Sequence, residues 1–153
     1  MGGNSTGMNF MTEDSELFLI DTNIFIYAYE KEDSIKKNKS KNLLDECLSG
    51  MKEFAISNQN LSAFVSVSTR KGKLSIEEAR NFVVKATQFA GFKKINYTAE
   101  TIPMALDFAQ EFKTSFWDAL LAATMRENGI FNIYTENVSD FKMPWIKAVN
   151  PLK

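Results

Sequence analysis

The sequence predicts an α/β fold, a three-layer sandwich in which a mostly parallel central sheet of about five strands is flanked by helices. Short apolar segments of strand length alternate with longer segments in which apolar residues recur at helical spacing. Parallel strands need crossover helices, and these cover the faces of the sheet. The length of 153 residues, with 44% hydrophobic and 24% charged residues, is typical of a globular protein with one core.

Five segments have the length and apolar content of strands: residues 17–20, 54–57, 93–96, 131–135 and 146–149. Helices are predicted between them, at residues 21–29, from the charged segment after Glu32 to Gly50, at 58–70, 75–91, 102–112 and 116–128. Asn58 is placed to cap one helix, and Ser75 and Glu78 form a capping box for the next. Gly129 ends the last helix. Cys47, the single cysteine, falls on an apolar helical face and is expected in the core.

The first sixteen residues, MGGNSTGMNFMTEDSE, differ in composition from the rest. They lack the basic and apolar regions of a signal peptide, so residues 1–16 are predicted to form a flexible tail and residues 17–153 a single domain. No apolar run approaches the roughly 18 to 20 residues that span a bilayer. A cytoplasmic protein with no membrane partner is therefore expected.

The sequence has no histidine, which excludes several kinds of chemistry. Ser-His-Asp and Cys-His catalysis, His-ligated zinc and proton transfer by imidazole all need this side chain. If the chain is an enzyme, carboxylates must carry the reaction. The net charge of −1 argues against a protein that coats nucleic acid indiscriminately, although a local basic groove is compatible with it.

Polar side chains follow two of the predicted strands at the point where each strand ends. Asp21 directly follows the apolar run at 17–20, and Asn137 and Asp140 lie in the loop after the fourth strand. In open parallel sheets, ligands bind outside the carboxyl ends of the strands. These side chains are therefore expected to lie close together in space.

Asp118 is a further candidate because its helix, FWDALLAATM, is apolar on nearly every side. A helix of this kind is buried, and a buried carboxylate needs a cation, hydrogen bonds or a proton. A divalent ion shared by Asp118 and Asp21 would satisfy both acids. Oxygen ligands without His or Cys favour Mg²⁺ or Mn²⁺ over zinc.

Each acid also has an ordinary structural explanation. Asp21 is placed to cap the helix that follows it, and Asp118 is the acidic residue of a capping box with Ser115. Asn137 and Asp140 are common turn formers. Their joint placement at the ends of predicted strands is what favours an acidic metal site.

Four ordered segments resemble one family: LFLIDTNIFIY at 17–27, AISNQNLSAFVSVSTRKGKLS at 55–75, SFWDALLAATMRENG at 115–129 and IYTENVSDF at 133–141, with a typical closing VNPLK. They resemble the PIN-domain nucleases, and within them the VapC-type ribonuclease toxins of toxin-antitoxin pairs. The resemblance runs from about Leu17 to Lys153 and implies a PIN-like sandwich.

The resemblance places the family's first acid at Asp21, with Thr22 and Asn23 as its neighbours, and its third acid at Asp118. The fourth position falls on Asn137, where the family accepts Asn or Asp, and Asp140 is a nearby acid. Candidate substrate contacts are Thr22, Asn23, Thr135 and Arg70. The resemblance implies cleavage of RNA phosphodiesters with Mg²⁺ or Mn²⁺ held by Asp21 and Asp118.

The second acid of the family is absent. Members usually carry Glu in the segment Gln-x-Leu-x-Glu-Phe, and this chain has Ala63 at that place in Gln59-Asn60-Leu61-Ser62-Ala63-Phe64. A natural loss of activity and a deliberate change of Glu to Ala would both produce this pattern. Glu46 and Glu136 are the alternative acids. We expect weak or absent activity in a chain that still folds.

The resemblance also implies three partners: RNA, a cognate antitoxin and a second copy of the chain in a homodimer. Two basic segments, residues 36–41 and 70–73, are candidate phosphate contacts or solvated surface. Phe116 and Trp117 are candidates for stacking on a base, with core packing expected for at least one of them. The alternative function is a catalytically dead PIN-like module that binds RNA or protein. A receiver-like domain is a third option, but its paired acid and its Lys are not evident.

Overall fold

The computed structural model describes residues 16–70 and 72–153. Five parallel strands form one sheet in the order β3-β2-β1-β4-β5. The strands are β1 (Phe18–Ile20), β2 (Phe54–Ser57), β3 (Phe92–Ile95), β4 (Asn132–Tyr134) and β5 (Lys147–Val149). The prediction of a parallel sheet of about five strands is thus confirmed. The predicted tail lies outside the described residues, apart from Glu16.

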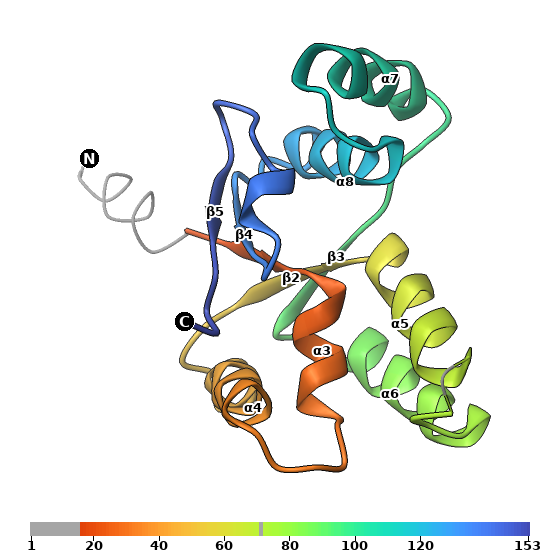
Figure 1. Cartoon of the computed structure of the whole chain (residues 1–153), viewed down its shortest axis with the longest axis vertical. Helices are drawn as coiled ribbons and strands as arrows, with labels where there is room; N and C mark the ends of the chain where they lie inside the picture. The colour runs from red at the N-terminus through yellow and green to blue at the C-terminus, as the bar shows by residue number, and fades with distance from the viewer. Residues whose placement is uncertain (1–15, 71) are drawn as a thin grey trace, which may run out of the picture.

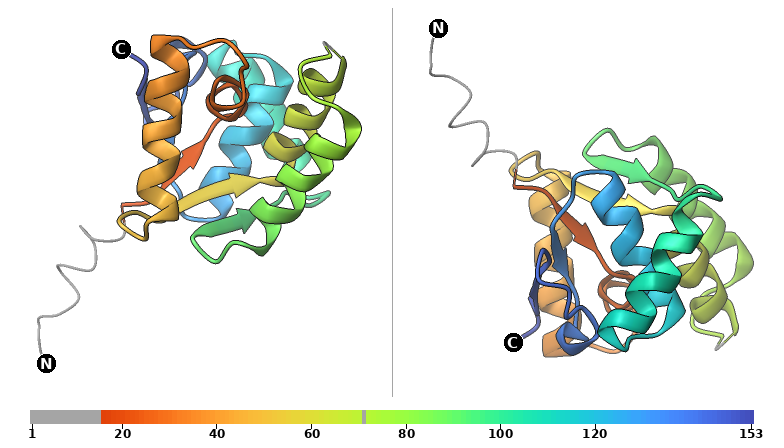
Figure 2. Two further views of the ribbon diagram at one scale, coloured as in Figure 1. Left: turned by 90° about the horizontal axis from the view of Figure 1, so that it is seen from below. Right: turned by 90° about the horizontal axis from the view of Figure 1, so that it is seen from above.

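Helices cover both faces of the sheet (Figure 1). They are α3 (Thr22–Ala28), α4 (Ile35–Leu48), α5 (Asn58–Arg70), α6 (Ile76–Gln88), α7 (Thr101–Phe112) and α8 (Phe116–Glu127), with a short 3₁₀ turn, η1 (Val138–Asp140). One face carries α3, α4, α5 and α6, and the other carries α8, which lies between the sheet and α7 (Figure 2). None of the helices in the described residues combines the length and hydropathy needed to cross a membrane.

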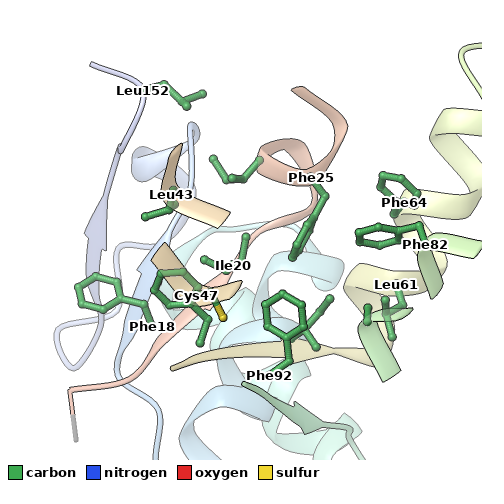
Figure 3. Close-up of a cluster of buried hydrophobic side chains, with 14 of the residues drawn as sticks. Phe18, Ile20, Phe25, Leu43, Cys47, Leu61, Phe64, Phe82, Phe92 and Leu152 are labelled. Atoms are coloured by element: carbon green, nitrogen blue, oxygen red, sulfur yellow. The ribbon is translucent and has the colours of Figure 1, made fainter. Parts of the chain in front are cut away.

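The central strand β1 shows why these layers form. Its side chains alternate between the two faces, so Phe18 and Ile20 enter one hydrophobic cluster and Leu19 enters another. All three are buried, as expected for a strand that has helices on both sides. Figure 3 shows the first cluster, in which Ile20 and Cys47 lie between the helices and the sheet. The prediction that Cys47 is buried is confirmed.

Several element boundaries differ from the prediction by one to three residues, and β3 and the cap of α5 show why. Strand β3 begins at Phe92, because Phe92 is buried in the core whereas Asn96 is exposed. Asn58 is the first residue of α5 and does not cap it. Ser57 caps the helix instead, since its Oγ accepts a hydrogen bond of 2.9 Å from the backbone N–H of Asn60.

Candidate functional site

Asp21 lies where β1 ends and α3 begins, at the carboxyl edge of the sheet. It is the N-cap of α3, and its Oδ1 accepts a 2.8 Å hydrogen bond from the N–H of Thr22. Asp21 therefore does cap α3, as its ordinary structural explanation requires. The second carboxylate oxygen has another partner, since Oδ2 accepts a 2.7 Å hydrogen bond from the hydroxyl of Thr135.

Thr135 directly follows β4, the strand beside β1, and its position explains how two distant segments meet. The backbone N–H of Asp21 donates to Tyr134 O at 3.0 Å, which continues the strand pairing to its end. Thr135 is fully buried, and its Oγ1 also accepts from the N–H of Asn137 at 3.0 Å. One hydroxyl thus joins the first acid to the loop that carries Asn137.

Asn60 is a site residue that the sequence did not reveal. It is 2% exposed, and its Nδ2 donates to Thr22 Oγ1 at 3.1 Å and to Asp21 Oδ1 at 3.4 Å. Its own Oδ1 accepts from Ser57 at 2.7 Å. The only signal in the sequence is a Ser three residues before an Asn at a junction of strand and helix.

Asp118 lies in the first turn of α8. Because α8 leads into β4, its last turn lies near the start of that strand, and its first turn lies at the carboxyl edge of the sheet, where Asp21 also lies. Ser115 caps this helix by accepting from the N–H of Asp118 at 3.1 Å. The Asp118 carboxylate accepts from the Ser115 hydroxyl at 2.9 Å rather than from the Ser115 backbone N–H, which is the bond of a capping box. Helix capping explains why Ser115 stands at this position, but it does not explain why the carboxylate of Asp118 is half-buried.

The pKa values show that the acids affect one another. Burial raises the pKa of Asp21, the bonds from Thr135 and Thr22 lower it, and the charges of Asp118 and Asp140 raise it again. Burial likewise raises the pKa of Asp118, the Ser115 bond lowers it, and the charge of Asp140 raises it. Thr114 Oγ1 donates to Asp140 O at 3.0 Å and so ties η1 to the start of α8. The charges of Asp21, Asp118 and Asp140 are thus close enough to influence one another.

Ala63 lines a cavity of about 600 Å³ beside these acids. It shares the cavity wall with Gln59 and Ser66 of the same helix. Gln59 Nε2 donates to Trp117 O at 2.9 Å, which links α5 to the residue just before Asp118. Since Ala63 follows Gln59 by one helical turn, a longer side chain at position 63 would extend from the same face.

The two alternative acids are engaged elsewhere. Glu136 accepts a 2.7 Å hydrogen bond from the hydroxyl of Tyr27 and forms an ion pair with Lys36, and Lys36 above all lowers its pKa. Glu46 forms an ion pair of 3.4 Å with Lys52 near the C-terminal end of α4. Because α4 leads directly into β2, this end of α4 lies at the opposite edge of the sheet.

The candidate substrate contacts lie at different distances from the acids. Thr22 and Asn23 lie in the first turn of α3, beside Asp21. Arg70 is exposed at the last residue of α5, ten residues beyond Asn60 and so about 15 Å along the helix axis. The structure brings Thr22, Asn23 and Thr135 to the acids, and it leaves Arg70 well away from them.

The donor set fits a hard divalent cation, although it is short of one carboxylate. Asp21 and Asp118 offer oxygen ligands, and a cation would relieve their repulsion. Asn23 Oδ1 is buried and has no hydrogen-bond partner within the described part of the chain, so it is an oxygen that lacks a donor. In residues 16–70 and 72–153, no three acids or thiols converge closely enough to enclose an ion. Position 63 is where a third carboxylate would project from α5.

Comparison with known families decides the identity of this fold. The model of the PIN domain matches residues 18–142, which is most of the chain. The chain belongs to the PIN domain family. The expected family is thus confirmed, and Asp21, Ala63, Asp118 and Asn137 all lie within the matched residues. No curated protein sequence matches the chain significantly.

Solved structures similar to this PIN domain come from toxin-antitoxin systems. A toxin-antitoxin complex from Klebsiella pneumoniae has 21% identity and a TM-score of 0.62, with 88% of this chain and 97% of that chain covered. VapC20 from Mycobacterium tuberculosis, described as a sarcin-ricin loop cleaving toxin, has 21% identity and a TM-score of 0.61, with 84% and 92% covered. VapBC2 from Rickettsia felis, bound to a promoter DNA fragment, has 18% identity and a TM-score of 0.64, with 88% and 98% covered. At these identities the likeness is one of fold.

Proposed function

We propose that this PIN domain is a metal-dependent endoribonuclease of the VapC toxin type, weak or inactive as it stands because Ala63 replaces an expected Glu. One observation carries the proposal. The partly buried carboxylate of Asp21 is held by Thr22 and Thr135, while the charges of Asp118 and Asp140 act on it from two other elements. Such a group of repelling acids at the carboxyl edge of a parallel sheet suits a cation and a phosphate.

The residues of the chain divide the work between binding and orientation. Asp21 and Asp118 would hold Mg²⁺ or Mn²⁺, with Asn137 and Asp140 farther out. Thr135 and Asn60 position the Asp21 carboxylate, and the bond from Thr135 favours its ionised form against the burial that raises its pKa. When bound, the ion supplies an acidified water and stabilises negative charge on the phosphate oxygens.

Ala63 sets the expected level of activity. A Glu at this position would add a carboxylate on the α5 side of the acids, where it would complete the ligand set or orient the attacking water. Loss of a group with a general acid or base role commonly lowers the rate by a factor of about 100 to 10,000. The fold does not depend on this group, because Ala63 lies on a cavity wall outside the hydrophobic clusters.

RNA contacts would extend from the acids over neighbouring elements. Thr22 and Asn23 lie beside the reacting phosphate in this scheme, and Arg70 reaches only RNA that continues along α5. Lys36 forms an ion pair with Glu136, and Lys73 forms an ion pair of 3.3 Å with Glu30. Phosphate binding by Lys36 or Lys73 therefore needs these ion pairs to open.

The proposed partners are RNA, an antitoxin and a second copy of the chain, in the cytoplasm. The toxin-antitoxin complexes among the similar structures support the antitoxin. The homodimer rests on the VapC resemblance. Size-exclusion chromatography with light scattering, with and without a co-expressed antitoxin, tests both partners.

The nuclease proposal is tested by comparing this chain with its Ala63→Glu and Ala63→Gln variants on single-stranded RNA. Cleavage with Mn²⁺ by Ala63→Glu that EDTA abolishes, and that Ala63→Gln lacks, supports the proposal. The Gln variant is the matched control because it has the size of Glu without its charge. An Ala63→Glu protein that is folded, binds Mn²⁺ and leaves RNA intact would refute it.

The second candidate is a PIN module that binds RNA or protein without cleaving it. The observation in its favour is that, over the described residues, no three carboxylates converge on a common point. Under this alternative, Ala63→Glu gains neither metal affinity nor cleavage, while RNA or antitoxin binding is unchanged.

A further inference from the structure

We propose that the cavity beside the acids binds an unpaired RNA base, stacked on Trp117 and recognised by the amides of Gln59 and Asn96. This base pocket is lined by residues of three elements: Asn58, Gln59, Ser62, Ala63 and Ser66 of α5, Asn96 and Tyr97 after β3, and Trp117 of α8. The inference rests on the proposed function and names the part of the substrate that this face accepts.

The position of the pocket links it to the reacting phosphate. Its walls come from the start of α5, the end of β3 and the start of α8, all at the carboxyl edge of the sheet. Trp117 directly precedes Asp118, and Ala63 marks the missing acid. A nucleotide with its phosphate at the acids therefore has a base within reach of this cavity. A volume of about 600 Å³ is within the range of pockets for small organic ligands.

The chemistry of the lining favours a base over a phosphate or a charged peptide. None of the eight lining residues carries a charge. A phosphate or a carboxylate would therefore find no cation there. Amide side chains offer both a donor and an acceptor, and base edges present the same combination. A neutral planar group with polar edges matches the pocket.

Trp117 supplies the stacking surface. Its side chain is 62% exposed, an unusual state for a large aromatic group, whereas its neighbour Phe116 packs against the cluster between α7 and α8. The two rings meet edge to face at 5.3 Å between centroids, which restricts the indole from one side. Stacking of a base on such a ring contributes about 1 to 3 kcal/mol.

Gln59 gives the pocket a fixed polar wall. Its Nε2 donates to Trp117 O, so the rotamer of the amide is set before any ligand arrives. Its Oε1 is buried and finds no hydrogen-bond donor in the residues that the structure describes. A buried acceptor without a partner costs about 1 to 3 kcal/mol, and a base amino group would remove this penalty after a small shift of the side chain.

The test uses the chain with Ala63, in EDTA, so that RNA is bound and not cleaved. Trp145 is first changed to Phe, which leaves Trp117 as the only tryptophan; Trp145 lies apart, packed on Phe108 and Arg126. Titration with single-stranded RNA should quench the fluorescence of Trp117. In a label-based assay, Trp117→Ala should weaken binding about 5- to 150-fold, and Trp117→Phe should restore most of it.

Two further variants separate base recognition from a general effect on the surface. Phe131→Ala removes an exposed aromatic ring at the opposite edge of the sheet and should leave RNA affinity unchanged. Asn96→Ala should change the order of affinity for poly-A, poly-C, poly-G and poly-U. A purely structural role of the pocket would leave that order as it is.

The failure of this inference differs from the failure of the nuclease proposal. If Ala63→Glu cleaves RNA, and adding Trp117→Ala changes neither the RNA affinity nor kcat/KM, the base pocket is refuted and the nuclease stands. If Ala63→Glu never cleaves but RNA binding still depends on Trp117, the nuclease is refuted and the base pocket stands. RNA affinity that is equal in the parent, Trp117→Ala and Asn96→Ala overturns the inference in either case.

Discussion

Thr135→Val isolates the contact that orients the first acid. The change removes one hydroxyl and keeps the shape of a side chain that is fully buried. Asp21 Oδ2 then loses its 2.7 Å donor, and the N–H of Asn137 loses its 3.0 Å acceptor. Asn137 is exposed, so water can replace that second bond, whereas Asp21 is only partly exposed, so water replaces the bond to its carboxylate less readily.

The size of the expected destabilisation follows from the charge on Asp21. A hydrogen bond to a charged group contributes about 1.5 to 3 kcal/mol and a neutral one about 0.5 to 1.5. We therefore expect Thr135→Val to lower the free energy of unfolding by about 2 kcal/mol at neutral pH. The loss shrinks to about 1 kcal/mol once Asp21 is protonated, because the hydroxyl stabilises the ionised form and this contribution disappears as the pH falls through the folded pKa.

Urea denaturation from pH 8 to pH 4 measures this difference, and NMR of the Asp21 carboxyl carbon should show its pKa rising in the variant. Thr124→Val is the matched control. Thr124 is equally buried, but its hydroxyl donates at 2.7 Å to Leu120 O of its own helix, so its loss should not vary with pH. A Thr135→Val loss that is constant with pH would refute the account of Asp21.

Three further predictions concern the acids and their support. Asp118→Asn should weaken Mn²⁺ binding at least about tenfold and make the metal-free protein more stable, by calorimetry and urea denaturation. Burial and neighbouring charge raise the pKa of Asp21 and of Asp118, so Mn²⁺ affinity should already decrease as the pH is lowered toward the usual aspartate range. The stability of the metal-free protein should increase as the pH is lowered over the same interval, because the folded state binds more protons than the unfolded one. Ser57→Ala should lower the free energy of unfolding by about 2 to 4 kcal/mol, because it removes a helix cap and leaves a buried oxygen of Asn60 without a donor, with exposed Ser66→Ala as control.

The fold was predictable because its strands β1 and β2 are buried on both faces. An apolar run such as Leu17 to Ile20 can only be a short core element, and the helices between the runs impose parallel pairing. The boundary errors have local causes. Ser57 competes with Asn58 for the cap, and the burial of Phe92 depends on packing between elements.

The site was predictable where strand order alone decides proximity. Asp21 and Thr135 end neighbouring parallel strands, so their meeting follows from the topology. Asn60 was missed because its contacts with Asp21 and Thr22 depend on how α5 packs beside α3, which no local pattern records. The pairing of Glu136 with Lys36 joins residues 100 positions apart, so the sequence could not exclude Glu136 as a ligand.

The central claim is that position 63 lacks one carboxylate of a divalent-metal site formed with Asp21 and Asp118. Isothermal titration with Mn²⁺ of the parent, Ala63→Glu and Ala63→Gln tests it most directly. The account predicts that Ala63→Glu binds Mn²⁺ at least about tenfold more tightly than both other proteins, and that adding Asp118→Asn removes the gain. Equal Mn²⁺ affinities for the three proteins would contradict it.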